Sequence, residues 1–483
     1  MNNRISYAAQ IVPSARQLAW QELEFYAFIH FGINTFTDKE WGLGDEDPAL
    51  FNPTAFDAKQ WVQVCQSAGM KGLILTCKHH DGFCLWPSAY TEHSVRNSPW
   101  RGGNGDIVKE VADACREVGI RFGVYLSPWD RRDQRYGSSL YNEFFKNQLR
   151  ELLTGYGDIF CVWFDGACGE GPNGLKQVYD WDGYYDVIRE LQPGAVISVC
   201  GPDVRWCGNE AGHTRESEWS VVPATLQNCE KIQEESQHVD DGEFSKRVNT
   251  RDADLGGREA IRKVEQLVWY PAEVNTSIRP GWFYHAAEDD KLRSVEKLLD
   301  IYYKSVGGNA TFLLNLPPDR RGLIHENDAV RMAEVGEILR STFRHNLASN
   351  AHATATEALN ENHDAGRILD GNKETFWCPQ EGTEQAAIEI DLNEERTFDT
   401  IVLQEHIQSG QRIEKLCLEY LKGDVWQRFY VCTVVGYKRI CRFPKVTARH
   451  VRLTVLESRW YPTLSAFEVY LGSREFSETE KES

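Results

Sequence analysis

The sequence of 483 residues lacks several features that would each indicate a class of protein. No apolar run approaches the roughly 20 residues of a membrane-spanning helix, so we expect no membrane partner. The start, "MNNRISYAAQIVPSARQLAW", lacks the apolar h-region of a signal peptide. These absences predict a cytoplasmic protein, or a periplasmic or secreted one from which a signal peptide has been removed.

Positive charge is also scarce. The chain has 53 Lys and Arg against 72 Asp and Glu, which gives a formal net charge of −19. Such a surface repels phosphate backbones and anionic lipid, and no glycine-rich phosphate loop is present. The composition therefore argues against nucleic acid and membrane as partners.

The thirteen cysteines include no C-x-x-C pair, which makes a cysteine-based zinc site a poor interpretation. Their number is odd, so at least one is unpaired. Cys77, Cys161 and Cys200 stand inside apolar runs, as buried thiols do. We expect a reducing compartment.

What is present, from about residue 24 to 343, is an alternation of short apolar runs with amphipathic segments. In residues 106–119, apolar side chains follow helical spacing up to a terminating glycine. Seven or eight such βα units over this length predict a (β/α)8-type barrel at residues 10–343. The sixth unit is the weakest, and residues 225–260 indicate a long loop. The strands are predicted at 25–32, 72–78, 121–128, 159–166, 195–201, near 217–220, 276–285 and 310–318.

The pattern changes after residue 344. "AAIEIDL" and "RHVRLTVLE" alternate apolar with polar residues, as strands with one buried face do. We predict an antiparallel β-sandwich over residues 344–473 and a disordered tail over 474–483. "LDGNKETFW" (369–377) and "PTLSAFEVYLG" (462–472) resemble the discoidin-type, or coagulation-factor C-type, sandwich. This domain is either a carbohydrate-binding module or a structural buttress; Trp460 and Tyr461 are its candidate exposed aromatics.

The barrel prediction gathers scattered polar and aromatic residues at one face, because chemistry in this fold lies at the carboxyl ends of the strands. Two adjacent histidines follow the second strand in "LTCKHHDGFCLWP". Neighbouring side chains of a strand face opposite ways, so both can line one pocket only where the chain leaves the strand. The residues at or near predicted strand ends are His30, His79, His80, Tyr125, Trp163, Asp165 and Trp282.

Each of these residues has an ordinary structural reading: a hydrogen-bonded histidine, an Asp-Gly turn, a core tryptophan. Their convergence on one face favours function. Imidazoles, carboxylates and aromatic rings can bind hydroxyls and stack on a sugar ring. Sugar hydrolysis usually needs two carboxyl groups. Asp165 is one candidate, and Glu210 in "GPDVRWCGNEAG" is the other, although a loop glutamate is often only a solvated charge.

Seven motifs together resemble the α-L-fucosidases of glycoside hydrolase family 29 across the barrel. "RWCGNEAG" in particular resembles the subgroup that cleaves α-1,3/1,4-linked fucose from branched, Lewis-type glycans. The motifs are "FIHFGINTFTDKEWG", "KHHDGFCLWPS", "GVYLSPWDR", "VWFDGA", "GPDVRWCGNEAG", "SIRPGWFYH" and "LLNLPP".

The resemblance implies a retaining enzyme without metal or other cofactor, acting on a fucosylated oligosaccharide or glycoconjugate. Asp165 matches the nucleophile and Glu210 the acid/base, with Glu216, Glu218 and Glu273 as other candidates for the second role. The positions that match substrate contacts are His30, Glu40, Trp41, His79, His80, Tyr125 and Trp163, and less closely Arg205 and Trp282.

Two other functions remain open at this point. A metal-dependent barrel hydrolase would use histidine ligands, but "FIHFG" offers only one on the first strand. A non-catalytic fucose-binding protein would keep the pocket without turnover. The sequence carries no signal for an oligomeric state.

Overall fold

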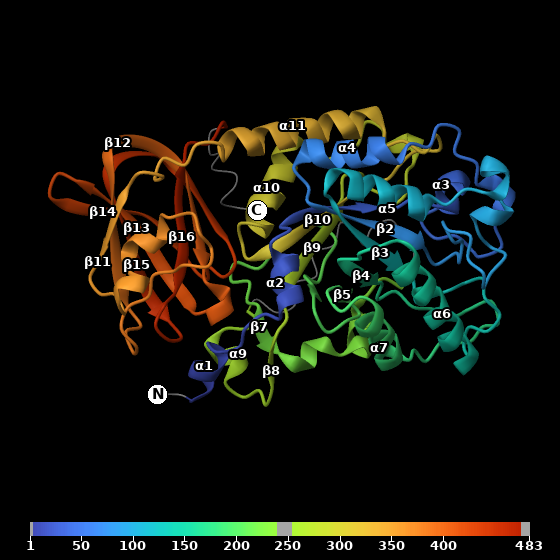
Figure 1. Ribbon diagram of the computed structural model, residues 1–483, viewed down its shortest axis with the longest axis horizontal. Helices are drawn as coiled ribbons and strands as arrows, with labels where there is room; N and C mark the ends of the chain where they lie inside the picture. Colours follow the sequence, from blue (N-terminus) through green and yellow to red (C-terminus); the bar gives the residue numbers. More distant parts are fainter. Residues whose placement is uncertain (1–2, 239–253, 475–483) are drawn as a thin grey trace.

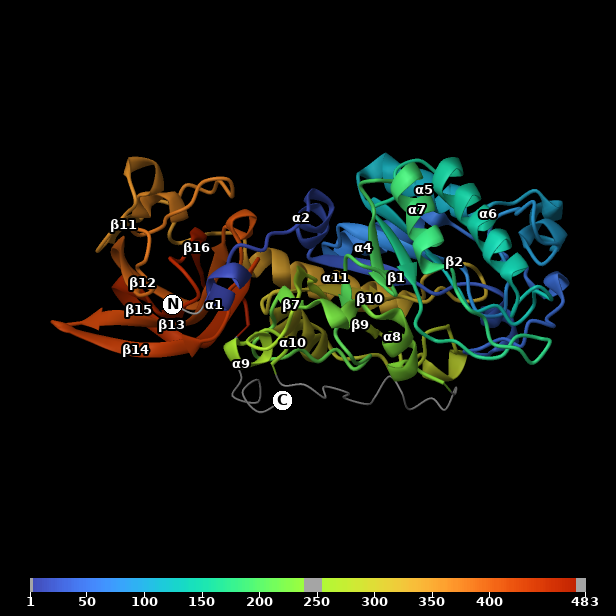
Figure 2. The same cartoon turned by 90° about the horizontal axis from the view of Figure 1, so that it is seen from below.

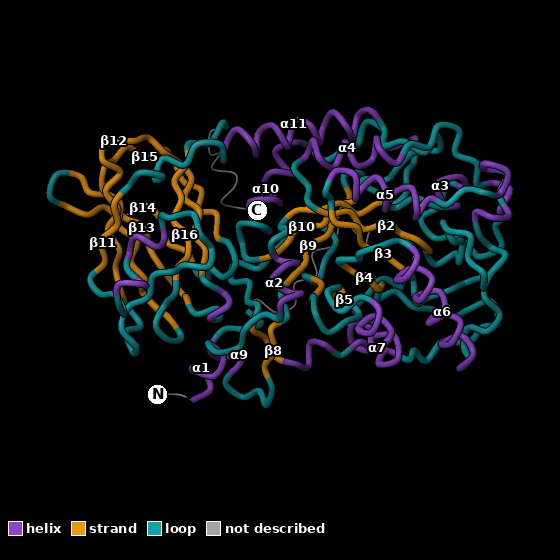
Figure 3. Tube along the Cα trace, viewed as in Figure 1, coloured by secondary structure: helices purple, strands orange, loops and turns teal. Residues whose placement is uncertain are grey.

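The computed structural model describes residues 3–238 and 254–474, and two bodies lie side by side within it (Figure 1). The larger body contains helices around a central set of strands, and the smaller one, at the C-terminal end of the chain, is built of strands (Figure 3). Of the tail predicted to be disordered, only residue 474 lies within the described residues.

Eight parallel strands form the core of the larger body, in the order β5-β4-β3-β2-β1-β10-β9-β6. A single parallel bridge between Ser198 and Val204 links the two ends of this order, so the sheet nearly closes into a barrel. The predicted barrel is confirmed. Its strands are β1 (Phe25–Ile29), β2 (Gly72–Lys78), β3 (Arg121–Leu126), β4 (Cys161–Phe164), β5 (Val196–Val199), β6 (Arg205–Trp206), β9 (Ala272–Ser277) and β10 (Ala310–Asn315).

The helices surround these strands, and their ends follow from local chemistry. In α5 the Asp106 side chain accepts from the amide of Lys109 at the start, and Gly119 adopts a left-handed conformation at the end. None of the helices among residues 3–238 and 254–474 combines the length and apolarity of a bilayer span. The helices are α1 (Asn3–Ala8), α2 (Ala15–Gln21), α3 (Ile33–Thr37), α4 (Ala58–Ala68), α5 (Ile107–Val118), α6 (Ser139–Gly155), α7 (Trp181–Leu191), α8 (Cys229–Glu235), α9 (Arg258–Ile261), α10 (Val295–Ser305) and α11 (Glu326–Thr342).

Three sequence predictions need correction. The sixth barrel strand is β6 and not the segment near 217–220, which precedes β7 (Val221–Pro223), paired with β8 (Leu267–Trp269) in a separate two-stranded sheet. The predicted strand at 276–285 ends at Ser277, so Trp282 stands in the following loop. The region 225–260 was predicted as loop, but its described part contains α8 and α9, and residues 239–253 lie outside the described residues.

The smaller body is an antiparallel sheet structure that closes on its own apolar core. Ile388 and Ile390 of β12 and Val451 and Leu453 of β15 are fully buried, as the alternation predicted. Its strands are β11 (His352–Ala355), β12 (Ala386–Glu405), β13 (Ile413–Lys422), β14 (Val425–Cys432), β15 (Arg439–Ser458) and β16 (Leu464–Tyr470).

The two bodies are joined by a buried polar contact as well as by chain connectivity. The Glu24 carboxylate, directly before β1, pairs with the ammonium group of Lys438 and accepts from the Tyr437 hydroxyl at 3.2 Å. Asn309 accepts from the Tyr437 amide at 2.7 Å and donates to the Glu218 carbonyl at 2.8 Å. The view from below shows α1 beside the sandwich strands (Figure 2), where it packs in one apolar cluster with residues of both bodies.

Candidate active site

A pocket lies at the carboxyl ends of the barrel strands and is lined by residues from six of them or the loops that follow. Nine of the eleven residues predicted from sequence line it: His30, Glu40, Trp41, His79, His80, Trp163, Asp165, Glu210 and Trp282. Tyr125 reaches the site through its hydroxyl, which donates to Asp165 at 3.0 Å. Arg205 stands outside the lining of this pocket.

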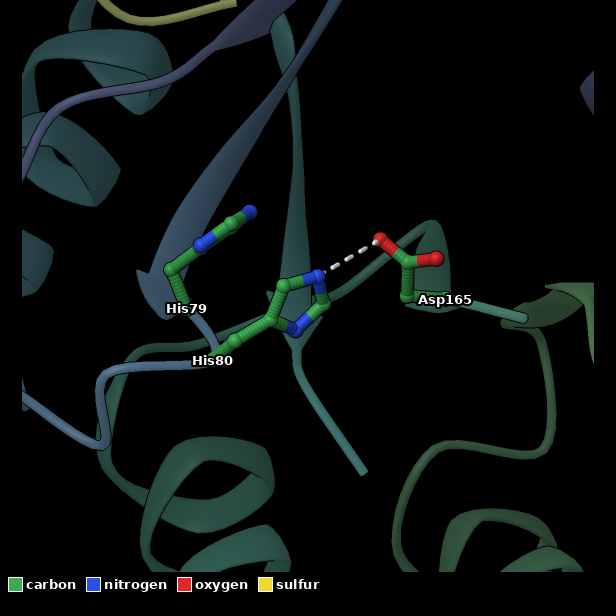
Figure 4. Close-up of side chains that lie close together, drawn as sticks. All are labelled: His79, His80 and Asp165. Carbon is green, nitrogen blue, oxygen red and sulfur yellow. Dashed lines mark ion pairs between the residues drawn. The ribbon is translucent and has the colours of Figure 1, made fainter. Parts of the chain in front are cut away.

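The adjacent histidines share the pocket because β2 ends at Lys78, one residue before them. The Nδ1 atom of His80 lies 2.7 Å from the Ser127 hydroxyl oxygen, and that hydroxyl donates its own hydrogen to the Trp129 carbonyl at 2.6 Å. Nδ1 of His80 must therefore carry the proton, and Nε2 is an acceptor. Figure 4 shows this Nε2 facing Asp165; the distance from Nε2 to Oδ2 is 3.8 Å.

His30 is held in the same tautomer by a different partner. Its Nδ1 lies 2.8 Å from the Asn315 side-chain oxygen. The Asn315 amide nitrogen donates to the Ser277 hydroxyl and to the Trp282 carbonyl, which settles the orientation of the amide. Nδ1 of His30 therefore donates, and its Nε2 is left as an acceptor.

Burial keeps all three histidines neutral. It lowers the pKa of His30 to about 3, and burial together with the nearby Arg131 lowers the pKa of His80 to about 3. Burial lowers the pKa of His79 well below its usual value, and its buried Nδ1 has no hydrogen-bond partner among the described residues. Neutral imidazoles with free acceptor nitrogens suit a ligand rich in hydroxyl groups.

Asp165 follows β4 and is held by donors on both oxygens. The Ala167 amide donates to Oδ1 at 2.8 Å, and the Tyr125 hydroxyl donates to Oδ2. Burial raises the pKa of Asp165, while these donors and the Gly166 amide act in the opposite direction. The side chain keeps 24% of its surface exposed toward the pocket, so the carboxylate is supported and still accessible.

Glu210 is held by a side-chain donor. Its carboxyl group accepts the indole N–H of Trp282 at 3.0 Å. Burial raises the pKa of Glu210 to about 8, against the effect of that hydrogen bond, and the negative charges of Asp165 and Glu40 add to the rise. A raised pKa favours the protonated form of this carboxyl group at neutral pH.

Glu40 and Trp41 approach the pocket from the loop after α3. The Glu40 carboxylate accepts the backbone amides of Trp282 at 2.8 Å and of Phe283 at 2.9 Å. The Trp41 ring stands edge-on to His80 and to Trp129, with ring centroids 5.5 and 5.3 Å apart. The ring contact places Trp41 against His80 in the wall of the pocket.

The other candidate carboxylates stand elsewhere. Glu216 is exposed. Glu218 is fully buried and pairs with Arg205 at 2.6 Å. Glu273 lies in the barrel interior, where it accepts from the Tyr26 hydroxyl at 2.6 Å and from the Trp163 indole at 2.7 Å. Glu273 therefore supports the tryptophan that lines the pocket, without lining it.

Several lining residues were not predicted from sequence. Trp206 of β6 donates to the Asn275 side-chain oxygen of β9 at 3.0 Å. Asn275 could have been found from strand alternation, had β9 been placed correctly, whereas a two-residue strand offers no periodicity for Trp206. The additional residues are Phe28, Gly166, Ala167, Val199, Trp206, Ser236, Gln237 and Asn275.

Within the described part of the chain, His79, His80 and Asp165 form one group that could hold a metal ion, since ligand atoms of all three lie within 4.8 Å of one another. The same atoms serve equally as acceptors for hydroxyl groups. Two imidazoles and a carboxylate can therefore bind either a metal ion or the hydroxyl groups of a ligand.

Comparison with known proteins gives two family matches. An α-L-fucosidase model matches residues 6–342, and an F5/8 type C domain model matches residues 352–469. Alpha-L-fucosidase 1 of Arabidopsis thaliana is 42% identical over 468 residues, covering 95% of this chain and 87% of the plant protein.

Solved structures give the same picture. A family 29 fucosidase of Ruminococcus gnavus, determined in complex with fucose, has a TM-score of 0.82 at 32% identity and covers 96% of each chain. A family 29 glycoside hydrolase from an unknown rumen bacterium has a TM-score of 0.78 at 40% identity, covering 97% of this chain and 79% of the other.

Proposed function

Because the chain belongs to the α-L-fucosidase family, glycoside hydrolase family 29, it is a glycoside hydrolase of that activity, and we propose that it works by retention on α-1,3/1,4-linked fucose. The proposed nucleophile is Asp165, and the proposed acid/base is Glu210. The proposed substrate is a branched, Lewis-type glycan.

The observation that carries this proposal is the contrast between the two carboxyl groups in one pocket. Burial raises the pKa of Asp165, but hydrogen bonds from two backbone amides and a hydroxyl oppose that rise and stabilise its negative charge. Glu210 accepts the Trp282 indole, and burial raises its pKa to about 8. One group is thus prepared to attack and the other to donate a proton.

In the first step an Asp165 oxygen bonds to the anomeric carbon of fucose. The bond to the leaving oxygen breaks, and Glu210 gives that oxygen its proton. In the second step Glu210 takes a proton from water, the water oxygen bonds to the anomeric carbon, and the bond to Asp165 breaks. Asp165 is uncharged in the intermediate, so Glu210 loses one of the charges that raise its pKa, which suits its change of role.

The histidines give the pocket its preference for particular hydroxyls. Nε2 of His30 and Nε2 of His80 can only accept, so each requires an O–H donor in the substrate. An analogue whose hydroxyl is missing or misplaced would leave these buried acceptors unpaired. We propose that fucose supplies those donors.

The linkage preference is supported by the "RWCGNEAG" motif, which contains Glu210. In the proposed substrate the N-acetylglucosamine that carries fucose also carries galactose, and this extra sugar would supply binding energy remote from the bond that breaks. We therefore expect turnover of Lewis a and Lewis x trisaccharides and little turnover of 2-fucosyllactose.

Three measurements test the proposal. Proton NMR during hydrolysis of Lewis a should detect α-L-fucose before the β anomer appears by mutarotation, whereas early β-L-fucose would mean inversion. Initial rates on Lewis a, Lewis x and 2-fucosyllactose test the linkage of the substrate, and a preference for 2-fucosyllactose would contradict the proposed linkage. Activity should also survive extensive dialysis against a chelator, because no proposed step uses a metal.

A further inference from the structure

His285, the last residue of the "SIRPGWFYH" motif, is outside the lining of the pocket and bridges two carboxylates. Its Nδ1 is 2.8 Å from an Asp38 oxygen, and its Nε2 is 2.8 Å from the Oε1 atom of Glu40. Each ring nitrogen faces an acceptor, so both must donate and the ring is an imidazolium. The hydrogen bond to Glu40 raises the pKa of His285 to about 9, against burial and with help from Asp38.

Glu40 carries the effect of this charge to the loop after β9. Its Oε1 accepts the Phe283 amide as well as His285, and its Oε2 accepts the Trp282 amide. A side chain at Gly281 would come within 2.8 Å of Glu40 Oε1 and 3.0 Å of the His285 ring, so the loop approaches this pair as closely as a glycine permits. Glu40 and His285 are thus in close contact with the loop at Gly281.

Trp282 is the next member of the chain of contacts. Its amide is held by Glu40, its carbonyl accepts from Asn315 at 2.7 Å, and its indole donates to Glu210 at 3.0 Å. The position of the Glu210 carboxyl group is thus tied through one tryptophan to the Glu40 carboxylate. Glu40 in turn is held from the far side by His285.

We propose that His285 is a positioning residue for proton transfer by Glu210, on which it acts through Glu40 and Trp282. The inference rests on the acid/base role proposed for Glu210. Without the imidazolium, Glu40 loses its charged partner and is free to turn from the loop. The Trp282 indole then ceases to hold the carboxyl group of Glu210 against the leaving oxygen.

The readout that separates this role from a structural one is the dependence on the leaving group. Lewis a loses a sugar alkoxide and needs a proton donor, whereas α-L-fucosyl fluoride loses fluoride and needs little protonation. His285→Phe should lower kcat/KM on Lewis a by about tenfold or more, and on the fluoride by less than about threefold. His285→Gln, which can still donate to Glu40, should recover part of the loss.

Three controls accompany these variants. His345→Gln changes an exposed histidine and should leave both values as in the wild type. Melting temperatures identify variants that lose activity through unfolding, and if His285→Phe does not fold, His285→Gln and Asp38→Asn must show the same selective loss in smaller degree. Glu210→Ala in the same series should show the strongest selectivity for the fluoride.

The results for His285→Phe and Glu210→Ala together distinguish failure of the positioning role from failure of the acid/base assignment. Suppose that Glu210→Ala loses kcat/KM mainly on Lewis a, whereas His285→Phe loses kcat/KM equally on Lewis a and the fluoride, or on neither. The positioning role of His285 is then overturned and the proposed function stands. If Glu210→Ala is not selective either, the acid/base assignment fails, and the inference about His285 fails with it. Selective loss in both variants supports the proposal.

Discussion

Nε2 of His80 and Oδ2 of Asp165 face each other at 3.8 Å with no proton to share, because the proton of His80 is on Nδ1 and donated to Ser127. Two acceptors side by side are mutually unfavourable until a donor enters. A substrate hydroxyl that donates to His80 next to Asp165, the proposed nucleophile, would remove this conflict.

The first prediction concerns His80 itself. His80→Ala removes one acceptor and should lower kcat/KM by roughly 5- to 100-fold, the range expected for a lost hydrogen bond to a substrate hydroxyl. His79→Ala should also lower kcat/KM, since His79 lines the same pocket. A large fall in melting temperature with little kinetic change would instead indicate that the residue acts in folding.

Asp165→Asn should nearly abolish turnover. The amide keeps the shape of the side chain and removes the attacking charge, so kcat should fall by roughly 10³-fold or more while the protein stays folded. Steady-state kinetics and circular dichroism check both parts. A variant that retains a tenth of the wild-type kcat would exclude Asp165 as the nucleophile.

Glu210→Ala should be rescued by azide. With α-L-fucosyl fluoride the glycosyl-enzyme still forms, and azide attacks it without a general base, so turnover should rise with azide and give β-L-fucosyl azide. The buried residues Glu218 and Glu273 provide matched comparisons. Rescue of Glu218→Ala or Glu273→Ala, and not of Glu210→Ala, would transfer the acid/base role to the rescued position.

The alkaline limb of the pH profile should report Glu210. An acid acts only while protonated, so kcat/KM on Lewis a should be sustained below the pKa of about 8 and fall as the pH rises through it. Glu210→Gln should remove this ionisation from the residual activity on fucosyl fluoride. An unchanged alkaline limb in that variant would assign it to another group.

The carboxylate of Glu24 should make the stability of the fold depend on pH in acid. Burial raises the pKa of Glu24, but the ammonium groups of Lys438 and Lys71 outweigh burial and lower this pKa to about 2. Because the pKa of Glu24 is lower in the folded state than the ordinary value of 4.5, its ionisation stabilises the folded state at pH values above 4.5. This contribution is lost as the pH falls toward 2. The shift corresponds to about 3 kcal/mol of unfolding free energy.

The measurement is the melting temperature between pH 6 and pH 3. The wild type should lose stability more steeply than Glu24→Gln over this window, and Glu22→Gln, at a neighbouring position, should behave as the wild type. If the melting temperatures of the wild type and Glu24→Gln change in parallel with pH, ionisation of Glu24 contributes nothing to the pH dependence of stability.

The barrel could be predicted from sequence because most of its strands are continuous apolar runs with amphipathic helices between them. β6 could not, since Arg205–Trp206 is too short to carry a period and its place depends on pairing with β9. The same limit hid Trp206 from the site prediction. Tertiary pairing, not local pattern, defines this part of the wall.

The site residues were predictable where they follow a strong strand, as His79, His80 and Asp165 do. The roles of the supporting residues were not, because they depend on contacts between distant segments. Asn315 determines the tautomer of His30 from 285 residues away. Glu40 holds Trp282 from 242 residues away, and no spacing in the sequence records that contact.

The contact of Glu24 and Asn309 with the segment around Tyr437 and Lys438 fixes the sandwich to the wall of the barrel. A module on a flexible linker raises the local concentration of its ligand over every distance that the linker can span. A module held rigidly keeps its ligand at one fixed distance from the active site. If this sandwich binds glycan, a bound chain can reach the pocket only when its own length matches one fixed separation, and the interface would then select for chain length.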